Sequence, residues 1–371
     1  MAVVETDHEA HDDHHDHGEF IAHHFESAEQ QFDSGKLGIW LFLVTEVLFF
    51  SGLFVAYTLY RVLHPEIFDQ AHVFLDKYLG FANTLVLLFS SLTMAVAVRY
   101  AQLGKNRHVV WYVLGTMVCA AAFLGVKAIE YTHKWDQGIM VRSYFDYHPG
   151  HHEASMPIAR ALGVSDYLIW LSIIPLLLVV GFAVYAGIAK MVRQPNASFF
   201  SACMALAVAG YFIGAMAGHF YMELTDGGIG GRSEEAAALM AYENEPHSDD
   251  EHTNKPADHH DESAAEQQKE TSEIAPYEGP RNDEFDQDIG IFFSIYYCMT
   301  GLHAIHIIAG IGFLAWILWR SILGHWRSDY FGPCDYVGLY WHLVDLIWIY
   351  LFPLLYLIDR SEEHTSELQS R

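Results

Sequence analysis

The stretch LGIWLFLVTEVLFFSGLFVAYTLY, residues 37–60, decides the fold. It contains a single charged side chain, Glu46, and about 20 apolar residues are enough for a helix to cross the hydrocarbon core of a bilayer. Six further stretches have the same character: residues 78–98, 109–129, 167–189, 198–222, 289–319 and 336–358. Backbone polar groups in lipid must be paired within their own segment, so the pattern predicts an all-α integral membrane bundle of seven transmembrane helices.

The charge of the chain lies almost entirely in two aqueous segments. Residues 1–36 carry a net charge of −9 and residues 223–288 carry −16, which together account for all but one unit of the total of −26. The rest of the chain has no basic stripe to neutralise phosphates, which excludes nucleic-acid binding. The four cysteines have no paired spacing, which disfavours a disulfide framework and a cysteine zinc site.

The chain therefore divides into seven parts. They are an acidic, histidine-rich tail (1–36), three helices (37–130), an outer loop (131–166), a helix pair (167–222), an acidic loop (223–288), two closing helices (289–358) and a tail (359–371). Residues 243–288 are too polar to bury a core, and we expect disorder there. Residues 360–371 resemble the translation of an adapter DNA sequence and are interpreted as an artefact of that origin.

The amino-terminal tail allows two interpretations. Residues 5–19 form a tract of aspartates and histidines, and five of its imidazoles could chelate a divalent metal. These are His8, His11, His14, His15 and His17. The simpler interpretation is a solvated acidic tail without a metal. The first thirty residues show neither a basic region nor an apolar core typical of a cleaved signal peptide, so the first span is expected to direct insertion.

Lysine and arginine in the short loops predict the orientation. The loops at 99–108, 190–197 and 320–335 carry seven of these residues and share one side of a seven-helix bundle. Such loops face the cytoplasm. This places the amino terminus inside, and the 223–288 loop and the carboxyl terminus outside, in a multi-pass membrane protein.

Ionisable residues at membrane depth usually mark function or a specific helix contact. Glu46 is either a proton-handling carboxylate or a protonated acid that is hydrogen-bonded between packed helices. Lys127 and Glu130 are spaced as an ion pair, with the Lys127 ammonium reaching toward the interface. His342 and Asp345 are spaced to share a hydrogen bond on one helix face.

The pair His303 and His306 raises the possibility of a haem. A bis-histidine haem in a bundle needs imidazoles from facing helices at matched depth, and the candidate partners are His219 and His342. Neither partner belongs to a second clear histidine pair. The Glu-x-x-His spacing of a carboxylate di-metal site is also missing around Glu46 and Glu130.

Five stretches carry a more specific signal when taken in order. They are 38–57 with Thr45-Glu46, NTLVLLFSS at 83–91, FLGVKAIEY at 123–131, TGLHAIHIIAG at 300–310, and YWHLVDLIW at 340–348. Together they resemble subunit III of haem–copper respiratory oxidases, the cytochrome c oxidase subunit 3 family. The order and number of these motifs make the resemblance specific over about 130 residues.

The resemblance implies a non-catalytic, accessory subunit of an aa3-type, proton-pumping cytochrome c oxidase. Haem a and copper would sit in partner subunits I and II, and this chain would bind no metal or cofactor except phospholipid. It would pack mainly on subunit I and support proton uptake and durability. The resemblance implies that Glu46 is the family's intramembrane acid. It also implies that His303, His306, His342 and Asp345 make hydrogen bonds between helices.

The chain departs from the family pattern in two places. Long family members have two helices before the core five, whereas this chain begins with the Glu46 helix. Instead, the helix pair 167–222 and the acidic loop separate the third and fourth core helices, where they could fill the lipid cleft or dock another subunit. Two alternatives stay open: the matching subunit of a quinol oxidase, and a membrane cytochrome whose haem is ligated by histidines.

Overall fold

The protein is described by a computed structural model, which covers residues 25, 27–71, 74–141, 144, 156–162, 164–224, 283–328 and 330–357. The histidine tract 5–19, residues 225–282 of the acidic loop and the tail 359–371 lie outside these residues. The helices are α1 (Ala28–Leu63), α2 (Pro65–Ala71), α3 (Lys77–Gln102), α4 (Asn106–Asp136), α5 (Pro157–Leu162), α6 (Asp166–Met191), α7 (Pro195–Leu224), α9 (Asp283–Ile322) and α10 (Gly332–Tyr356).

Seven of these helices, α1, α3, α4, α6, α7, α9 and α10, are long and apolar enough to cross a membrane. The all-α bundle with seven membrane-length helices is therefore confirmed. Most of these helices extend beyond the predicted spans, because hydropathy marks only the apolar part of a helix. Helix α1 starts at Ala28, where the Ser27 side chain accepts a hydrogen bond from the amide of Gln30 at 3.1 Å. Helix α9 starts at Asp283, so the last residues of the acidic loop are helical and not disordered as expected.

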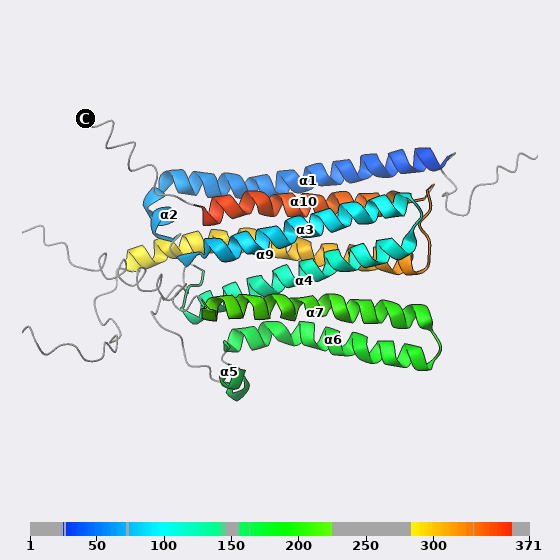
Figure 1. Cartoon of the computed structure of the whole chain (residues 1–371). Helices are drawn as coiled ribbons and strands as arrows, with labels where there is room; N and C mark the ends of the chain where they lie inside the picture. Colours follow the sequence, from blue (N-terminus) through cyan, green and yellow to red (C-terminus); the bar gives the residue numbers. More distant parts are fainter. Residues whose placement is uncertain are drawn as a thin grey trace, which may run out of the picture.

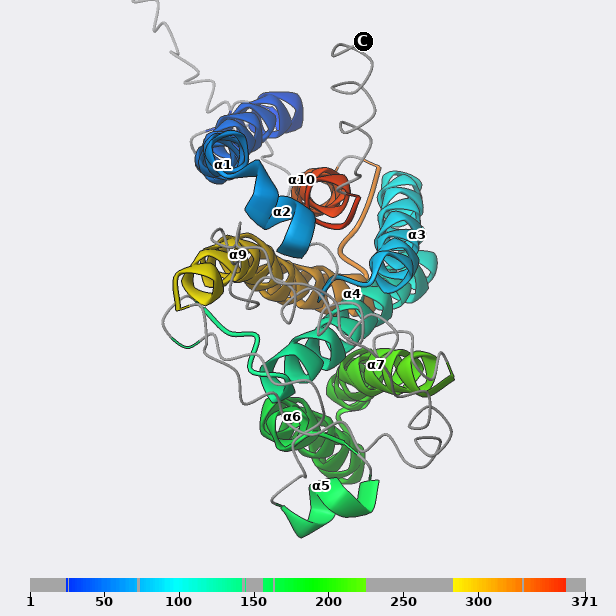
Figure 2. The same ribbon diagram turned by 90° about the vertical axis from the view of Figure 1, so that its left-hand side faces the viewer.

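The long helices run side by side in one bundle (Figure 1). Helix α4 is central, since it packs against α3, α7, α9 and α6. Helix α10 packs against α3, α9 and α1. Viewed along the bundle, α1 lies at one margin and the helix pair α6 and α7 lies at the other (Figure 2). The arrangement leaves most of α1 and α6 uncovered by the rest of the chain.

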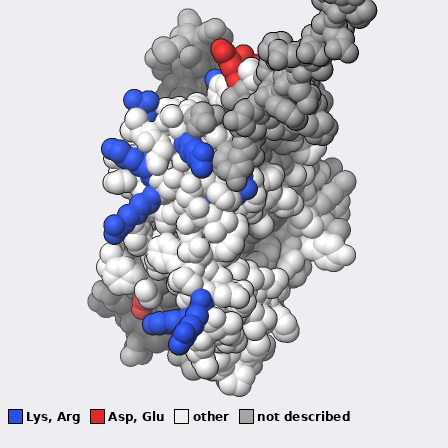
Figure 3. Space-filling model, turned by 90° about the vertical axis from the view of Figure 1, so that its right-hand side faces the viewer, with Lys and Arg blue, Asp and Glu red and all other residues white. Residues whose placement is uncertain are grey.

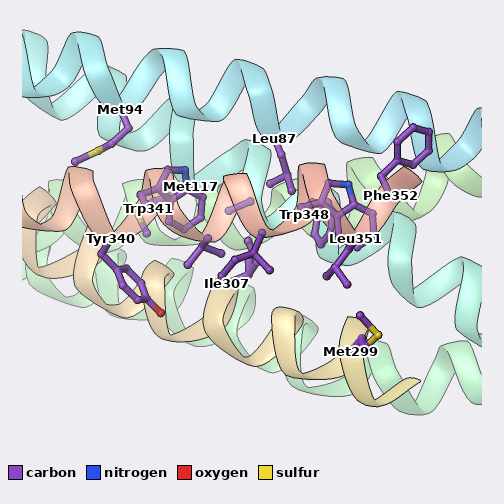
Figure 4. Close-up of a cluster of buried hydrophobic side chains, with 14 of the residues drawn as sticks. Leu87, Met94, Met117, Met299, Ile307, Tyr340, Trp341, Trp348, Leu351 and Phe352 are labelled. Carbon is purple, nitrogen blue, oxygen red and sulfur yellow. The ribbon is translucent and has the colours of Figure 1, made fainter. Parts of the chain in front are cut away.

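The core between α3, α4, α9 and α10 is filled by large side chains (Figure 4). Two tryptophans of α10 are fully buried there, and each indole finds a polar partner on α3. Trp341 Nε1 donates to Ser90 Oγ at 3.1 Å, and Trp348 Nε1 donates to Thr84 Oγ1 at 3.0 Å. These two bonds fix the rotation of α10 relative to α3.

The closest approach of two helices is between α4 and α7. A Cβ atom added at Gly210 would meet the Val118 carbonyl oxygen at 2.7 Å, and one at Gly214 would overlap the carbonyl oxygen of Ala122. Gly210, Gly214 and Gly218 form a small-xxx-small series of the kind that lets membrane helices touch backbone to backbone. Helix α7 of the α6–α7 pair therefore packs directly on the central helix α4.

Helix α9 also contains small residues, but they form a looser contact. Of its three glycines between residues 301 and 312, Gly310 lies against a neighbour, since a Cβ atom added there would be 2.7 Å from the Trp341 ring. Gly301 and Gly312 face open space in the part of the chain that the structure describes. The glycine seam of α7, formed by Gly210, Gly214 and Gly218, is therefore a tighter contact than the one at Gly310.

Candidate functional site

A pair of ionisable side chains joins α1 to α9 at membrane depth. Glu46 Oε2 lies 3.0 Å from His306 Nε2, and the side chains are 18% and 16% exposed. The other imidazole nitrogen, Nδ1, lies 2.9 Å from the carbonyl oxygen of Leu302, one turn earlier in α9. Sequence spacing did not suggest this pair, because its members are 260 positions apart.

The geometry determines how many protons the pair holds. A carbonyl oxygen only accepts hydrogen bonds, so His306 Nδ1 must carry a proton to make its bond with Leu302. Either Glu46 is protonated and donates to the bare Nε2, or an imidazolium donates from Nε2 to the carboxylate. In both forms one proton lies between the two side chains. The hydrogen bond between α1 and α9 therefore depends on this proton, since its release would leave a carboxylate facing a bare imidazole nitrogen.

The Glu46–His306 pair is one of several polar contacts that attach α1. Tyr336 Oη donates to the carbonyl oxygen of Phe32 at 2.8 Å, and Tyr57 Oη donates to the carbonyl oxygen of Leu354. Both of these bonds reach α10, whereas the pair reaches α9. The edge of Phe50 also packs on the His306 ring, at 5.1 Å between centroids.

A second polar group, the charge cluster, is buried at the far end of α4. It comprises Lys127, Glu130, Lys134, Tyr296 and Tyr356. Glu130 is its centre: Oε2 lies 2.8 Å from Lys127 Nζ and Oε1 lies 3.0 Å from Lys134 Nζ. Both phenols donate to Oε1, Tyr296 at 2.7 Å and Tyr356 at 2.6 Å. All three charged side chains are at most 6% exposed.

The aromatic rings around the charge cluster supply further stabilisation. Lys127 Nζ lies 4.6 Å from the ring centre of Trp348 and 5.1 Å from that of Tyr356, distances suited to cation–π attraction. Two cations face one carboxylate here. The carbonyl end of α4 also lies nearby, because Lys134 is in the last turn of the helix. The cluster locks α4, α9 and α10 together.

The prediction that the Lys127 ammonium reaches toward the interface is wrong. Its ammonium does not reach toward the interface but points into the bundle, toward Glu130 and Tyr356 Oη at 2.6 Å. Lys134 was assigned to the outer loop, because hydropathy ends the span at residue 129 whereas the helix continues to Asp136. Its i,i+4 spacing from Glu130 was the signal that could have identified it.

His303 is fully buried in an aromatic setting. Its ring lies 5.6 Å from Phe123 and 5.2 Å from Trp348, centre to centre. Neither imidazole nitrogen has a hydrogen-bond partner in the described ranges. This differs from the hydrogen bond between helices that the resemblance implies.

His342 and Asp345 do not share a hydrogen bond, contrary to expectation. His342 Nδ1 lies 2.8 Å from Ser91 Oγ, and Asp345 Oδ2 accepts from Ser90 Oγ at 3.3 Å. Both α10 side chains thus bind serines of α3 instead of each other. The reason is rotational, since both turn toward α3 across the helix interface.

The histidines do not converge on one point. His306 is engaged by Glu46 and Leu302, His342 by Ser91, and His303 is enclosed by aromatic rings. Within the described ranges, no group of three or more His, Cys, Asp or Glu could hold a metal ion. His306 and His342 are therefore each engaged by another polar group.

Known proteins resemble the last part of the chain. The family model described as "Cytochrome c oxidase subunit III" matches residues 280–359, which comprise α9 and α10. Over 71 residues the chain is 39% identical to cytochrome c oxidase subunit 3 of Thermostichus vulcanus, covering 19% of this chain and 35% of that protein. Its counterpart from Synechocystis sp. is 43% identical over 70 residues, 18% of this chain and 30% of that protein.

A vertebrate relative gives the same result. Cytochrome c oxidase subunit 3 of Danio rerio is 37% identical over 67 residues, 18% of this chain and 26% of that protein. The chain thus spans about a third or less of the length of the curated relatives that it matches. No solved structure matches the chain significantly.

The matched segment contains His303, His306, His342 and Asp345, and it supplies both phenols of the charge cluster. Glu46, Lys127 and Glu130 lie outside it. Over α9 and α10, the chain is similar to the family described as cytochrome c oxidase subunit III.

Proposed function

We propose that this chain is the accessory, non-redox subunit III of a proton-pumping, aa3-type cytochrome c oxidase. The family match over α9 and α10 carries the proposal. The Glu46–His306 contact adds support, because it joins the matched part of the chain to the helix whose acid the motifs single out. In this role the chain contributes no bond-making residue.

The role requires partners. Subunit I would be the main contact and subunit II a second one, with haem a and copper held by those subunits and phospholipid bound by this chain. The chain would be a multi-pass protein of the bacterial plasma membrane. The loops at 99–108, 190–197 and 320–335 lie at the same end of the bundle as the start of α1 (Figure 1). Their lysines and arginines support a cytoplasmic amino terminus.

Two alternatives fit less well. A cytochrome ligated by histidines needs free, facing imidazoles, whereas His306 and His342 are engaged by other side chains. The matching subunit of a quinol oxidase would look alike in this chain, but the relatives are named cytochrome c oxidase subunit 3. The type of subunit II encoded beside this chain would separate the two oxidases.

The proposal is tested by purification of the tagged chain from native membranes in mild detergent. We expect a larger subunit to co-purify with an a-type haem spectrum, and we expect the haem to stay with that subunit when this chain is stripped away. Haem that remains on this chain alone would refute the accessory role and establish a histidine-ligated cytochrome.

A substitution at Glu46 tests the proton-related role. In Glu46→Gln the amide can still donate to His306 Nε2, so the contact between α1 and α9 is kept while the shared proton is lost. We expect unchanged yield of the complex and a loss of turnover of about twofold to tenfold, below the hundredfold or more typical of a direct proton-transfer group. The measurement is oxygen consumption across a pH series, with the number of turnovers before inactivation.

The matched control is Ser51→Ala on the same helix. Ser51 Oγ donates only to the Leu48 carbonyl oxygen at 2.7 Å, so its removal changes α1 without touching the pair. We expect this variant to match the wild type. If Glu46→Gln also matches the wild type at every pH, Glu46 serves only to hold α1.

A further inference from the structure

One end of the bundle, the basic end, gathers positive charge. It comprises residues 27–36, 99–108, 190–197 and 320–335, which include eight Lys and Arg against four Asp and Glu. The cations are Lys36, Arg99, Lys105, Arg107, Lys190, Arg193, Arg320 and Arg327, and the acids are Glu29, Asp33, Asp329 and Asp335. Figure 3 views this end and shows Lys and Arg side chains distributed over the face.

Two loops of the basic end are held together by a polar bracket. Asn106 Nδ2 donates to the Trp326 carbonyl oxygen at 2.9 Å, and its Oδ1 accepts from the Trp326 amide at 2.9 Å. The Trp326 indole donates in turn to Ser321 Oγ at 2.7 Å. The bracket fixes Lys105 and Arg107 beside Arg327, and all three are exposed.

The amino-terminal segment begins at this same end. Residues 1–24 lie outside the described residues and connect to α1, whose first turn is part of the basic end. They contain seven acids, seven histidines and neither lysine nor arginine. A tethered peptide meets a surface near its anchor at a millimolar effective concentration. A chain of 24 residues is long enough to cross several packed helices, which lie about 8–10 Å apart.

We propose that residues 5–19 of this chain dock on the basic end when their histidines are neutral, and that protonation of the histidines releases them. The contact is electrostatic, between seven tail carboxylates and the exposed cations of three loops. Tethering favours this occupant over anionic lipid headgroups, which are the alternative. The inference rests on the charges of the chain and does not depend on the proposed function.

The proposed pH dependence follows from the tail composition. Histidine titrates near pH 6.5, so the side-chain charge of residues 1–24 changes from about −6 at pH 7.5 to about −1 at pH 5.5. The groups that face the tail lose no positive charge in this interval. Lysine and arginine are cationic throughout this interval. The other ionisable side chains of the basic end are the imidazoles of His108 and His325 and the carboxylates of Glu29, Asp33, Asp329 and Asp335. Attraction is lost because the tail itself is neutralised.

Photocrosslinking of the full chain tests the docking. Benzoylphenylalanine replaces Ala10, and the chain is placed in nanodiscs of phosphatidylcholine, which carry no net charge. At pH 7.5 we expect adducts on peptides that carry Lys105, Arg107, Arg193 or Arg327. Peptides with Lys77, an exposed cation at the opposite end of the bundle, should carry none. At pH 5.5 the adduct yield should fall by about tenfold.

Two variants separate charge from proximity. In the first variant, all seven histidines of residues 1–24 are converted to Gln while the acids are kept, and its adducts should persist at both pH values. In the second, the seven acids of residues 1–24 are converted to Asn and Gln, which should abolish the adducts at both pH values. Adducts that survive loss of the acids would refute electrostatic docking. Adducts on lipid alone at pH 7.5 would also refute the docking. They would favour lipid headgroups as the ligands of the basic end.

Discussion

Glu130→Gln is expected to lower the free energy of unfolding of the chain by about 3–5 kcal/mol, the usual cost of breaking a buried ion pair from one side. The substitution leaves Lys127 and Lys134 without a carboxylate in a site where both are at most 6% exposed. The amide oxygen can still accept from one phenol, but it cannot neutralise either ammonium. The excess charge, not the loss of hydrogen bonds, dominates the effect.

The measurement is reversible unfolding of the full chain in mixed micelles, with a surface ion pair as the control. Lys36 and Asp335 lie 4.0 Å apart, and their side chains are 44% and 20% exposed. Asp335→Asn should therefore cost less than about 1 kcal/mol. Equal effects of the two substitutions would show that the charge cluster contributes no more than a surface pair.

Gly214→Val is expected to displace the α6–α7 hairpin from α4, with a cost above the roughly 1–3 kcal/mol typical of overpacking. The added Cβ would overlap the carbonyl oxygen of Ala122, and backbone cannot move aside as a flexible side chain can. The two helices must separate along the seam, which uncovers Gly125 on α4. Disulfide crosslinking between introduced cysteines on α4 and α7 reports the separation directly.

Gly187→Val is the matched control for the helix pair. A Cβ at Gly187 on α6 meets nothing within 4 Å, so the same change in side chain is made without a clash. Its unfolding free energy should equal or slightly exceed that of the wild type, because valine is a better helix former than glycine. A large loss in this variant would attribute the Gly214→Val effect to the residue type and not to the seam.

Features that lie within one helix could be predicted from the sequence. The stretch 37–60 and its six counterparts identify the membrane helices because apolar length is a local property. The proximity of Lys127 and Glu130 follows from their i,i+3 spacing for the same reason.

Contacts between helices were harder to foresee. The partner of Glu46 depends on how α1 and α9 are rotated about their axes, and composition does not encode that rotation. Tyr296 and Tyr356 were not identified because a phenol in an apolar stretch looks like any buried aromatic residue. His342 and Asp345 show the limit of spacing: they share a helix face, yet both bind serines of α3 and not each other.

The position of the charge cluster along the chain sets the order in which it is completed during synthesis. Helix α4 leaves the ribosome with Glu130 as the counter-ion of two lysines, and the phenols of Tyr296 and Tyr356 follow 166 and 226 residues later. At roughly 5–20 residues per second, the second phenol arrives about 10–45 s after the carboxylate. A chain that stops before α10 thus retains an incompletely solvated cation within the bilayer. The polar partners of Lys127 and Glu130 are therefore complete only after α10 has been made.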